Sequence, residues 1–146
     1  MPSQQLQGAT VTRTSYGNLQ LTLQAPIIKV YDSPEHYTVY PRGVKMTFYD
    51  DSHEVKASIK ADSAISKDDR NLMEAFGNVV VEDRHTGDTT YLHRIAWNTA
   101  DGRLWSDTTV RSVNGRRVTY GDGFESDDRL ENLHITHQRG TIEIND

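Results

Sequence analysis

Hydrophobic and polar residues alternate along most of the chain with a period of two, as in a β-strand with one buried face. The alternation is clearest in residues 19–24, 44–49 and 55–61. We expect one strand in each run, and we expect the first to stop at Pro26, because proline cannot donate to a hydrogen-bond ladder. Runs of the same kind recur as far as Ile144, so the pattern predicts strands along almost the whole chain.

Turn signals divide the second half of the chain at a regular spacing. Gly87, Gly102 and Gly115 mark turns, and the pattern recurs at Asp127-Asp128 and at Gly140, so successive turns lie 12 to 15 residues apart. Each interval has room for one strand and one reversal. Asn114-Gly115 predicts a type I′ hairpin, which requires positive φ at both central residues. Hairpins in tandem without a helical period predict an all-β, antiparallel architecture.

Two segments depart from the alternation. Residues 1–15 are rich in Gln, Thr and Ser, and we expect a flexible arm with a late edge strand. Residues 66–76 begin with a serine and two early acids, followed by Leu72, Met73 and Phe76 at helical spacing. This segment predicts either a short helical turn or another strand.

Composition supports the β interpretation and indicates one domain. Thr, Val and Ile outnumber Leu and Ala by 34 to 17, and branching at Cβ favours strands over helices. Only 35% of the residues are hydrophobic, which suits sheets with one wet and one buried face. No linker or compositional break interrupts the 146 residues, so we expect a single domain over 1–146.

Charge and cysteine content narrow the function classes. The net charge is −5 and the basic residues are scattered, so no basic stripe predicts nucleic-acid binding. The absence of cysteine excludes disulfides and thiolate metal sites. No apolar run is long enough for a membrane helix, and no secretory signal is visible at Met1. Either the protein is cytosolic, or an export and anchoring segment has been removed from a longer precursor.

No pattern of residues predicts an enzyme, a metal site or a cofactor. His134 and His137 are three apart, so on a strand they project to opposite faces. The acidic pairs sit beside turn signals, where Asp bonds the local backbone. Ser106 and Ser126 lie outside any nucleophile elbow. Trp97 and Trp105 could stack on sugars, although in a small β-domain we expect them in the core.

A succession of short motifs resembles a known family. Phe48-Tyr49-Asp50, Ala61-Asp62-Ser63-Ala64 and Gly77-Asn78-Val79 are followed by Trp97, Ser106-Asp107, Gly121-Asp122-Gly123-Phe124, Ser126-Asp127 and Gly140. Their order and spacing resemble the LptC family, the periplasmic, membrane-anchored component of the lipopolysaccharide export machinery. The similarity covers roughly residues 15 to 142. The family's membrane anchor, which precedes the jellyroll, has no counterpart in this chain.

The resemblance implies a single open, twisted antiparallel β-jellyroll of the OstA/LptA-like kind. It implies a non-enzymatic protein that takes lipopolysaccharide from an inner-membrane ABC transporter complex and passes it to a soluble periplasmic jellyroll bridge protein. The full-length protein would be periplasmic and anchored to the inner membrane. The interior of the jellyroll would hold the lipid A acyl chains. We assign this lining to Leu21, Leu23, Ile28, Met46, Phe48, Val55, Ile59, Val79, Val81, Ile95 and Val110.

Partner docking would use the two strand edges at the ends of the stack. We place the transporter side near residues 16–24. We place the bridge-protein side at the C-terminal edge, on Leu133, Ile135, Ile142 and Ile144, where an incoming strand can pair. Two rival interpretations stay open: a carbohydrate-binding sandwich with both tryptophans exposed on a flat face, and a structural assembly module with a tightly packed interior.

Overall fold

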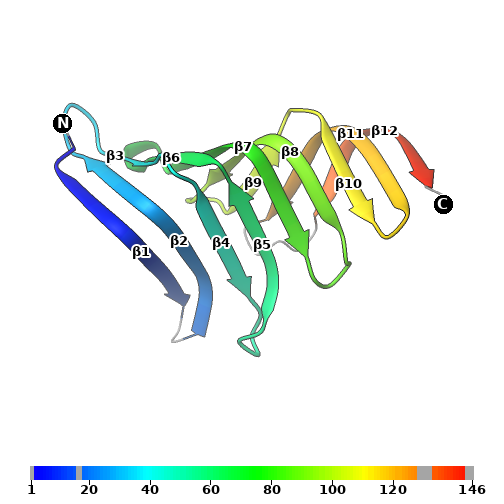
Figure 1. Ribbon diagram of the computed structural model, residues 1–146, viewed down its shortest axis with the longest axis horizontal. Helices are drawn as coiled ribbons and strands as arrows, with labels where there is room; N and C mark the ends of the chain where they lie inside the picture. The colour runs from blue at the N-terminus through cyan, green and yellow to red at the C-terminus, as the bar shows by residue number, and fades with distance from the viewer. Residues whose placement is uncertain (1, 16–17, 128–132, 144–146) are drawn as a thin grey trace.

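A computed structural model describes residues 2–15, 18–127 and 133–143 of the chain, and most of them lie in strands (Figure 1). One antiparallel sheet contains twelve strands, which confirms the predicted all-β, jellyroll-like fold. The strands are β1 (Gln4–Ser15), β2 (Asn18–Tyr31), β3 (Tyr37–Tyr40), β4 (Val44–Tyr49), β5 (Val55–Ala61), β6 (Ser63–Lys67), β7 (Leu72–Asp83), β8 (Thr89–Asn98), β9 (Arg103–Ser106), β10 (Val110–Asn114), β11 (Arg117–Asp127) and β12 (His134–Glu143).

The long strands β2, β7, β8 and β11 each run through two walls of the stack, and short strands fill the space between them. From β2 to β7, one wall follows the order β2-β4-β5-β7 and the other follows β2-β3-β6-β7. From β8 to β11, β10 fills one wall and β9 the other. Hydrogen bonds therefore close the sheet around the interior twice, and the stack stays open at its ends, where β1 and β12 lie.

Each long strand bends where it passes from one wall to the other. In β7 the bend is a bulge, because Phe76 pairs with Arg94 but Val79 already pairs with Leu92. Gly77 and Asn78 occupy the extra position with φ of 79° and 44°, a region that glycine and asparagine tolerate best.

The bend in β7 is held from the opposite chain segment by Asp62, which joins β5 to β6. Its N–H donates to the Gly77 carbonyl at 2.9 Å, and its carboxylate accepts from the Asn78 side chain at 2.7 Å. Two motifs that are far apart in the sequence therefore form one corner of the fold.

The structure corrects four sequence-based expectations. Gln4–Ser15 is a complete strand paired along β2 and not a flexible arm. β2 continues through Pro26, because the strand bends there: its residues before Pro26 pair with β4 and those after it with β3. Gly140 lies within β12 instead of in a turn. The β10–β11 turn is centred on Gly115-Arg116, with Asn114 paired to Arg117, and only Gly115 has positive φ.

Residues 66–76 contain both of the expected structures. Strand β6 ends at Lys67, a single 3₁₀ turn covers Asp68–Arg70, and β7 begins at Leu72. Asn71 ends the turn in the left-handed region, with φ of 51°. The acids that resembled a helix start therefore begin a tight connection between two strands of one wall.

Candidate functional site

The interior between the two walls is apolar from β2 to β11. Ten of the eleven residues assigned to the lining are buried there, with exposed fractions between 0% and 7%. The exception is Val55, which is half-buried at the start of β5. The ten are Leu21, Leu23, Ile28, Met46, Phe48, Ile59, Val79, Val81, Ile95 and Val110.

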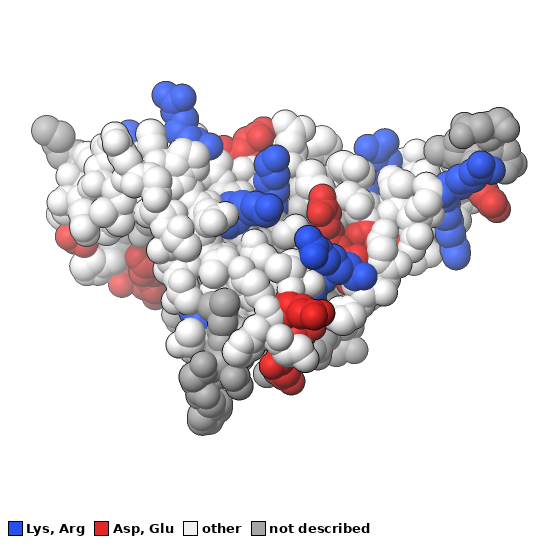
Figure 2. Space-filling model, turned by 60° about the horizontal axis from the view of Figure 1, so that its bottom comes forward, with Lys and Arg blue, Asp and Glu red and all other residues white. Residues whose placement is uncertain are grey.

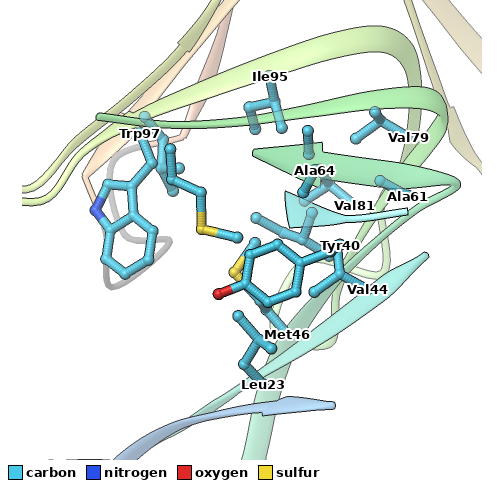
Figure 3. Close-up of a cluster of buried hydrophobic side chains, with 14 of the residues drawn as sticks. Leu23, Tyr40, Val44, Met46, Ala61, Ala64, Val79, Val81, Ile95 and Trp97 are labelled. Carbon is cyan, nitrogen blue, oxygen red and sulfur yellow. The ribbon is translucent and has the colours of Figure 1, made fainter. Parts of the chain in front are cut away.

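The side chains meet across the interior from opposite walls. In Figure 3, Leu23 and Met46 lie beside the ring of Tyr40, which comes from the other wall, with Val79 and Ile95 beyond them. Cross-strand pairing explains why they share a face: Leu23 pairs with Met46, and Met46 with Ile59. Ten of the eleven residues assigned to the lining therefore belong to one contiguous hydrophobic core.

Sequence reasoning missed several members of this core. Tyr40, Met73, Leu92, Leu104 and Phe124 are buried but were not assigned to the lining. The alternation of buried and exposed side chains in β8 shifts by one residue where the strand runs opposite the β7 bulge. Leu92 and Ile95 therefore both point inward, and the two residues between them are exposed. The signal that could have shown this was Gly77-Asn78, a pair typical of a bulge.

Polar groups interrupt the apolar interior at several points, among them the hydrogen-bonded pair Thr90 and Ser112, the Tyr40 hydroxyl and the Trp97 indole. Burial raises the pKa of the Tyr40 hydroxyl, and the negative charge of Asp68 raises that pKa further. The indole N–H of Trp97 is buried and has no hydrogen-bond partner among the residues that the structure describes. Such a group costs about 1–3 kcal/mol. In Figure 3 the indole nitrogen lies on the side of the ring turned away from Tyr40 and Met46.

The two tryptophans lie on different faces. Trp97 is in the core, as expected, but Trp105 is half-buried on the outer face of β9. The guanidinium of Arg103 covers the Trp105 ring at 4.8 Å and also bonds Glu125 at 2.9 Å. Neither ring therefore forms the flat exposed platform that the carbohydrate-binding interpretation requires.

Two strand edges are unpaired within the described part of the chain. β1 pairs only with β2, and β12 only with β11, so the outer backbone groups of both can accept another strand. The edge at the N-terminal end is therefore β1 and not residues 16–24, because β1 covers β2.

The predicted docking residues of the C-terminal edge fall into three groups. Leu133 and Ile135 are half-buried and pack against the core. Ile142 is exposed, with 55% of its surface accessible. Ile144 lies outside the described residues.

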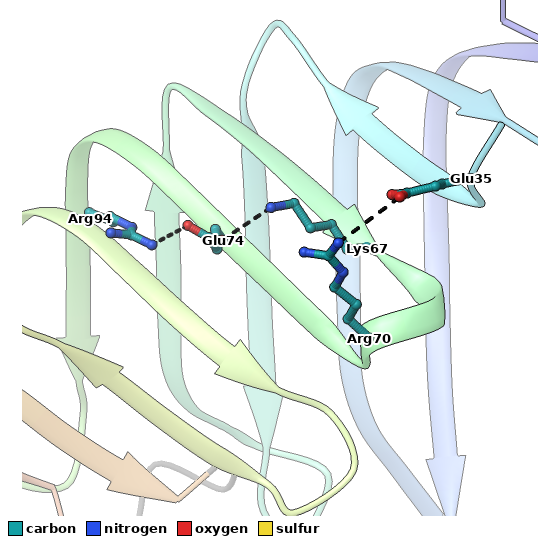
Figure 4. Close-up of polar contacts among 5 residues, drawn as sticks. All are labelled: Glu35, Lys67, Arg70, Glu74 and Arg94. Atoms are coloured by element: carbon teal, nitrogen blue, oxygen red, sulfur yellow. Dashed lines mark hydrogen bonds and ion pairs between the residues drawn. The ribbon is translucent and has the colours of Figure 1, made fainter. Parts of the chain in front are cut away.

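The outer surface carries charges of both signs. On the face shown in Figure 2, Lys and Arg are interspersed with Asp and Glu, with no continuous stripe of one sign. On the outer face of the wall that contains β6, Glu74 lies between Arg94, which bonds it, and Lys67, whose Nζ is 3.8 Å away (Figure 4). Arg70 and Glu35 form a second, looser pair at 4.0 Å (Figure 4).

The described residues offer no arrangement of ligands for a metal. They contain no group of three or more His, Cys, Asp or Glu side chains that could hold an ion. His134 lies 3.7 Å from Glu125, and His137 occupies a position with φ of 50° opposite the bend in β11. Ser106 bonds Thr108, and Ser126 bonds the Asp127 carbonyl, so both hydroxyls serve the local backbone and its turns.

Among the described residues, no helix has the length and apolar character that crossing a membrane requires. No protein-family model matches the chain, and no curated protein matches its sequence.

Proposed function

We propose that the protein is a non-enzymatic carrier of lipopolysaccharide that holds the lipid A acyl chains in the interior of its jellyroll. It would take the lipid from an inner-membrane ABC transporter complex and pass it to a soluble periplasmic jellyroll protein. The full-length protein would be periplasmic and anchored to the inner membrane. This proposal rests on the motif resemblance and on one structural observation, the continuous apolar interior.

The length of that interior supports binding of an extended apolar ligand. Core side chains follow one another from Leu21 on β2 to Phe124 on β11, so an acyl chain would meet mostly apolar groups along its path. Burial is worth about 0.8 kcal/mol per CH₂, or roughly 10 kcal/mol for a twelve-carbon chain. The interior side chains already contact one another. The bound acyl chain must therefore replace those contacts as the two walls move apart.

The corners give the walls a place to flex. The long strands run through both walls, and the bend in β7 contains Gly77 and Asn78 in left-handed conformations. A rotation at such a bend separates the walls without breaking the ladders on either side of it. The lipid would therefore be admitted by a change of angle at the corners.

The two free edges support transfer between proteins of the same fold. A jellyroll that pairs its edge strand with β12 would extend the sheet, and its interior would continue the one described above. Ile142 on β12 is exposed, so it can contact the arriving protein, whereas Leu133 and Ile135 hold β12 to its own core. β1 offers the corresponding edge toward the transporter.

The close packing of the interior favours a second candidate, a structural assembly module that joins other β-proteins through β1 and β12 and carries no lipid. Ile59, Val79 and Val110 are completely enclosed, as such a module requires. This candidate predicts partner binding at the edges and no lipid binding.

Native mass spectrometry with purified lipopolysaccharide separates the two candidates. The carrier forms an adduct with the mass of one intact lipopolysaccharide, and the delipidated oligosaccharide forms none, because the acyl chains supply the binding energy. If no adduct with intact lipid survives under conditions that preserve a known acyl-binding protein's complex, the carrier proposal is wrong and the assembly module remains.

A further inference from the structure

A groove of about 460 Å³ lies at the outer surface where β8 leaves β10 to join β9. β10 pairs with β8 only as far as Tyr91, and β9 begins to pair at Ala96, so the intervening backbone of β8 has no strand beside it on that side. The lining residues are Asn78, Val79, Val80, Tyr91, Leu92, His93, Thr109, Arg111 and Tyr120.

The sheet register brings the outward side chains of the groove into one row. Val80 pairs with Tyr91, Tyr91 with Arg111, and Arg111 with Tyr120, so all four project from the same face of neighbouring strands. The guanidinium of Arg111 stacks on the Tyr91 ring at 4.6 Å. Stacking holds the cation at the rim of the groove while leaving its N–H groups at the edge of the plane.

The charge of the groove differs from that of the protein as a whole. The chain carries a net charge of −5, yet the described residues that line the groove include Arg111 and His93 and no acid. In the described part of the chain, Arg111 forms no ion pair, and its guanidinium stacks on the Tyr91 ring. Arg103 has the same stacked geometry on Trp105, but its charge is compensated by Glu125.

From these contacts we infer that the groove binds a single-chain anionic amphiphile, an acyl chain ending in a carboxylate. The carboxylate pairs with the Arg111 guanidinium, which presents parallel donors to two oxygens. The acyl chain lies along Val80 and the two tyrosine rings. The row that holds this ligand is on the outer face of the wall, whereas Val79 and Leu92, which also line the groove, belong to the interior proposed to carry lipopolysaccharide.

Two-dimensional amide NMR of the whole chain tests this assignment with three probes: octanoate, octan-1-ol and acetate. Octanoate is expected to give saturable shifts at Val80, His93 and Arg111. Octan-1-ol, which has the chain without the charge, and acetate, which has the charge without the chain, bind about tenfold more weakly, since each lacks one of the two contacts. Equal affinity for octanoate and either partial probe would overturn the inference.

Three variants locate the site. Arg111→Gln is expected to weaken octanoate about tenfold, and Arg111→Lys to weaken it less, because the charge is kept. Arg103→Gln, which removes a stacked arginine elsewhere, leaves the affinity unchanged. Octanoate shifts centred on interior amides such as Ile59, or an affinity that Arg111→Gln does not change, would refute the groove. Neither result depends on whether lipopolysaccharide binds.

Discussion

Glycine at position 123 allows β11 to pass close against β12, and adding a single methyl group there should separate the two strands. A Cβ atom at Gly123 would lie 2.1 Å from Thr136 Oγ1 and 3.0 Å from the Ser106 carbonyl oxygen. The first contact is far inside the van der Waals limit. We therefore expect Gly123→Ala to displace Thr136 and to loosen the pairing of β12.

The size of the effect follows from two opposing terms. Overpacking of this kind costs about 1–3 kcal/mol. Replacing glycine by alanine also restricts the unfolded chain, which contributes about 0.4–1 kcal/mol of stability where the backbone is not strained. The net loss should be about 1–2 kcal/mol. For a domain of this size, that lowers Tm by about 3–6 °C.

Gly140→Ala provides the matched control. Gly140 lies in the neighbouring strand β12, but nothing lies within 4 Å of its Cβ position and its φ is not positive. This variant keeps only the entropic gain, so its Tm should stay the same or rise slightly. Thermal unfolding followed by circular dichroism measures both variants.

A double variant tests the cause of the loss. Thr136→Ala removes the hydroxyl that the new methyl group meets, so Gly123→Ala combined with Thr136→Ala should be less destabilised than the sum of the two single changes. If the effects add without interaction, or if Gly123→Ala is as stable as Gly140→Ala, then close strand approach is not the reason for this glycine.

Three further changes test a buried tyrosine, an ion pair and the unpaired edge of β12. Burial and Asp68 raise the pKa of Tyr40, so the unfolded chain loses this proton first, and the free energy of unfolding should fall as the pH rises above 10.0. Tyr40→Phe should therefore show a smaller fall in Tm between about pH 9 and 11 than the unmodified protein. An equal fall would contradict the raised pKa of Tyr40. Glu74→Gln leaves Arg94 without its carboxylate partner and should lower the free energy of unfolding in urea by about 1 kcal/mol, a small value because Arg94 is half exposed to solvent. This loss should be smaller at high salt. A loss that does not change with salt would argue against an electrostatic role for the pair. Deletion of residues 139–146 removes exposed parts of β12 and should abolish binding to a soluble jellyroll partner in a pull-down while leaving lipopolysaccharide binding intact; unchanged partner binding would exclude docking at this edge.

Alternation predicted the strands that have one face wet and one buried. Val44–Tyr49 alternates in burial as its sequence alternates in polarity, because both of its neighbours are regular strands of the same wall. In residues 1–15 the sequence predicted only a late edge strand, and the rest of β1 was missed for the opposite reason. Its residues are nearly all exposed, so it has no apolar face to detect, and backbone pairing with β2 forms it regardless of side-chain pattern.

The bends explain the remaining differences. At Pro26 and at Gly77-Asn78 the chain passes from one wall to the other, so the inward face changes within a single strand. Local sequence shows that such a bend exists, but which wall each half joins depends on partners far away along the chain. The outer groove could not be predicted for the same reason, because its row of Val80, Tyr91, Arg111 and Tyr120 comes from four strands and is set by register.

Photo-crosslinking from adjacent positions tests most directly whether the interior carries the lipid. An aliphatic diazirine residue at Leu23 or Met46 projects into the interior, whereas the same residue at Thr22 or Lys45 projects from the outer face of the same strands. With bound lipopolysaccharide, we predict strong labelling from the two interior positions and little from the two outer ones. Equal labelling from both pairs would contradict the claim that the acyl chains lie inside the jellyroll.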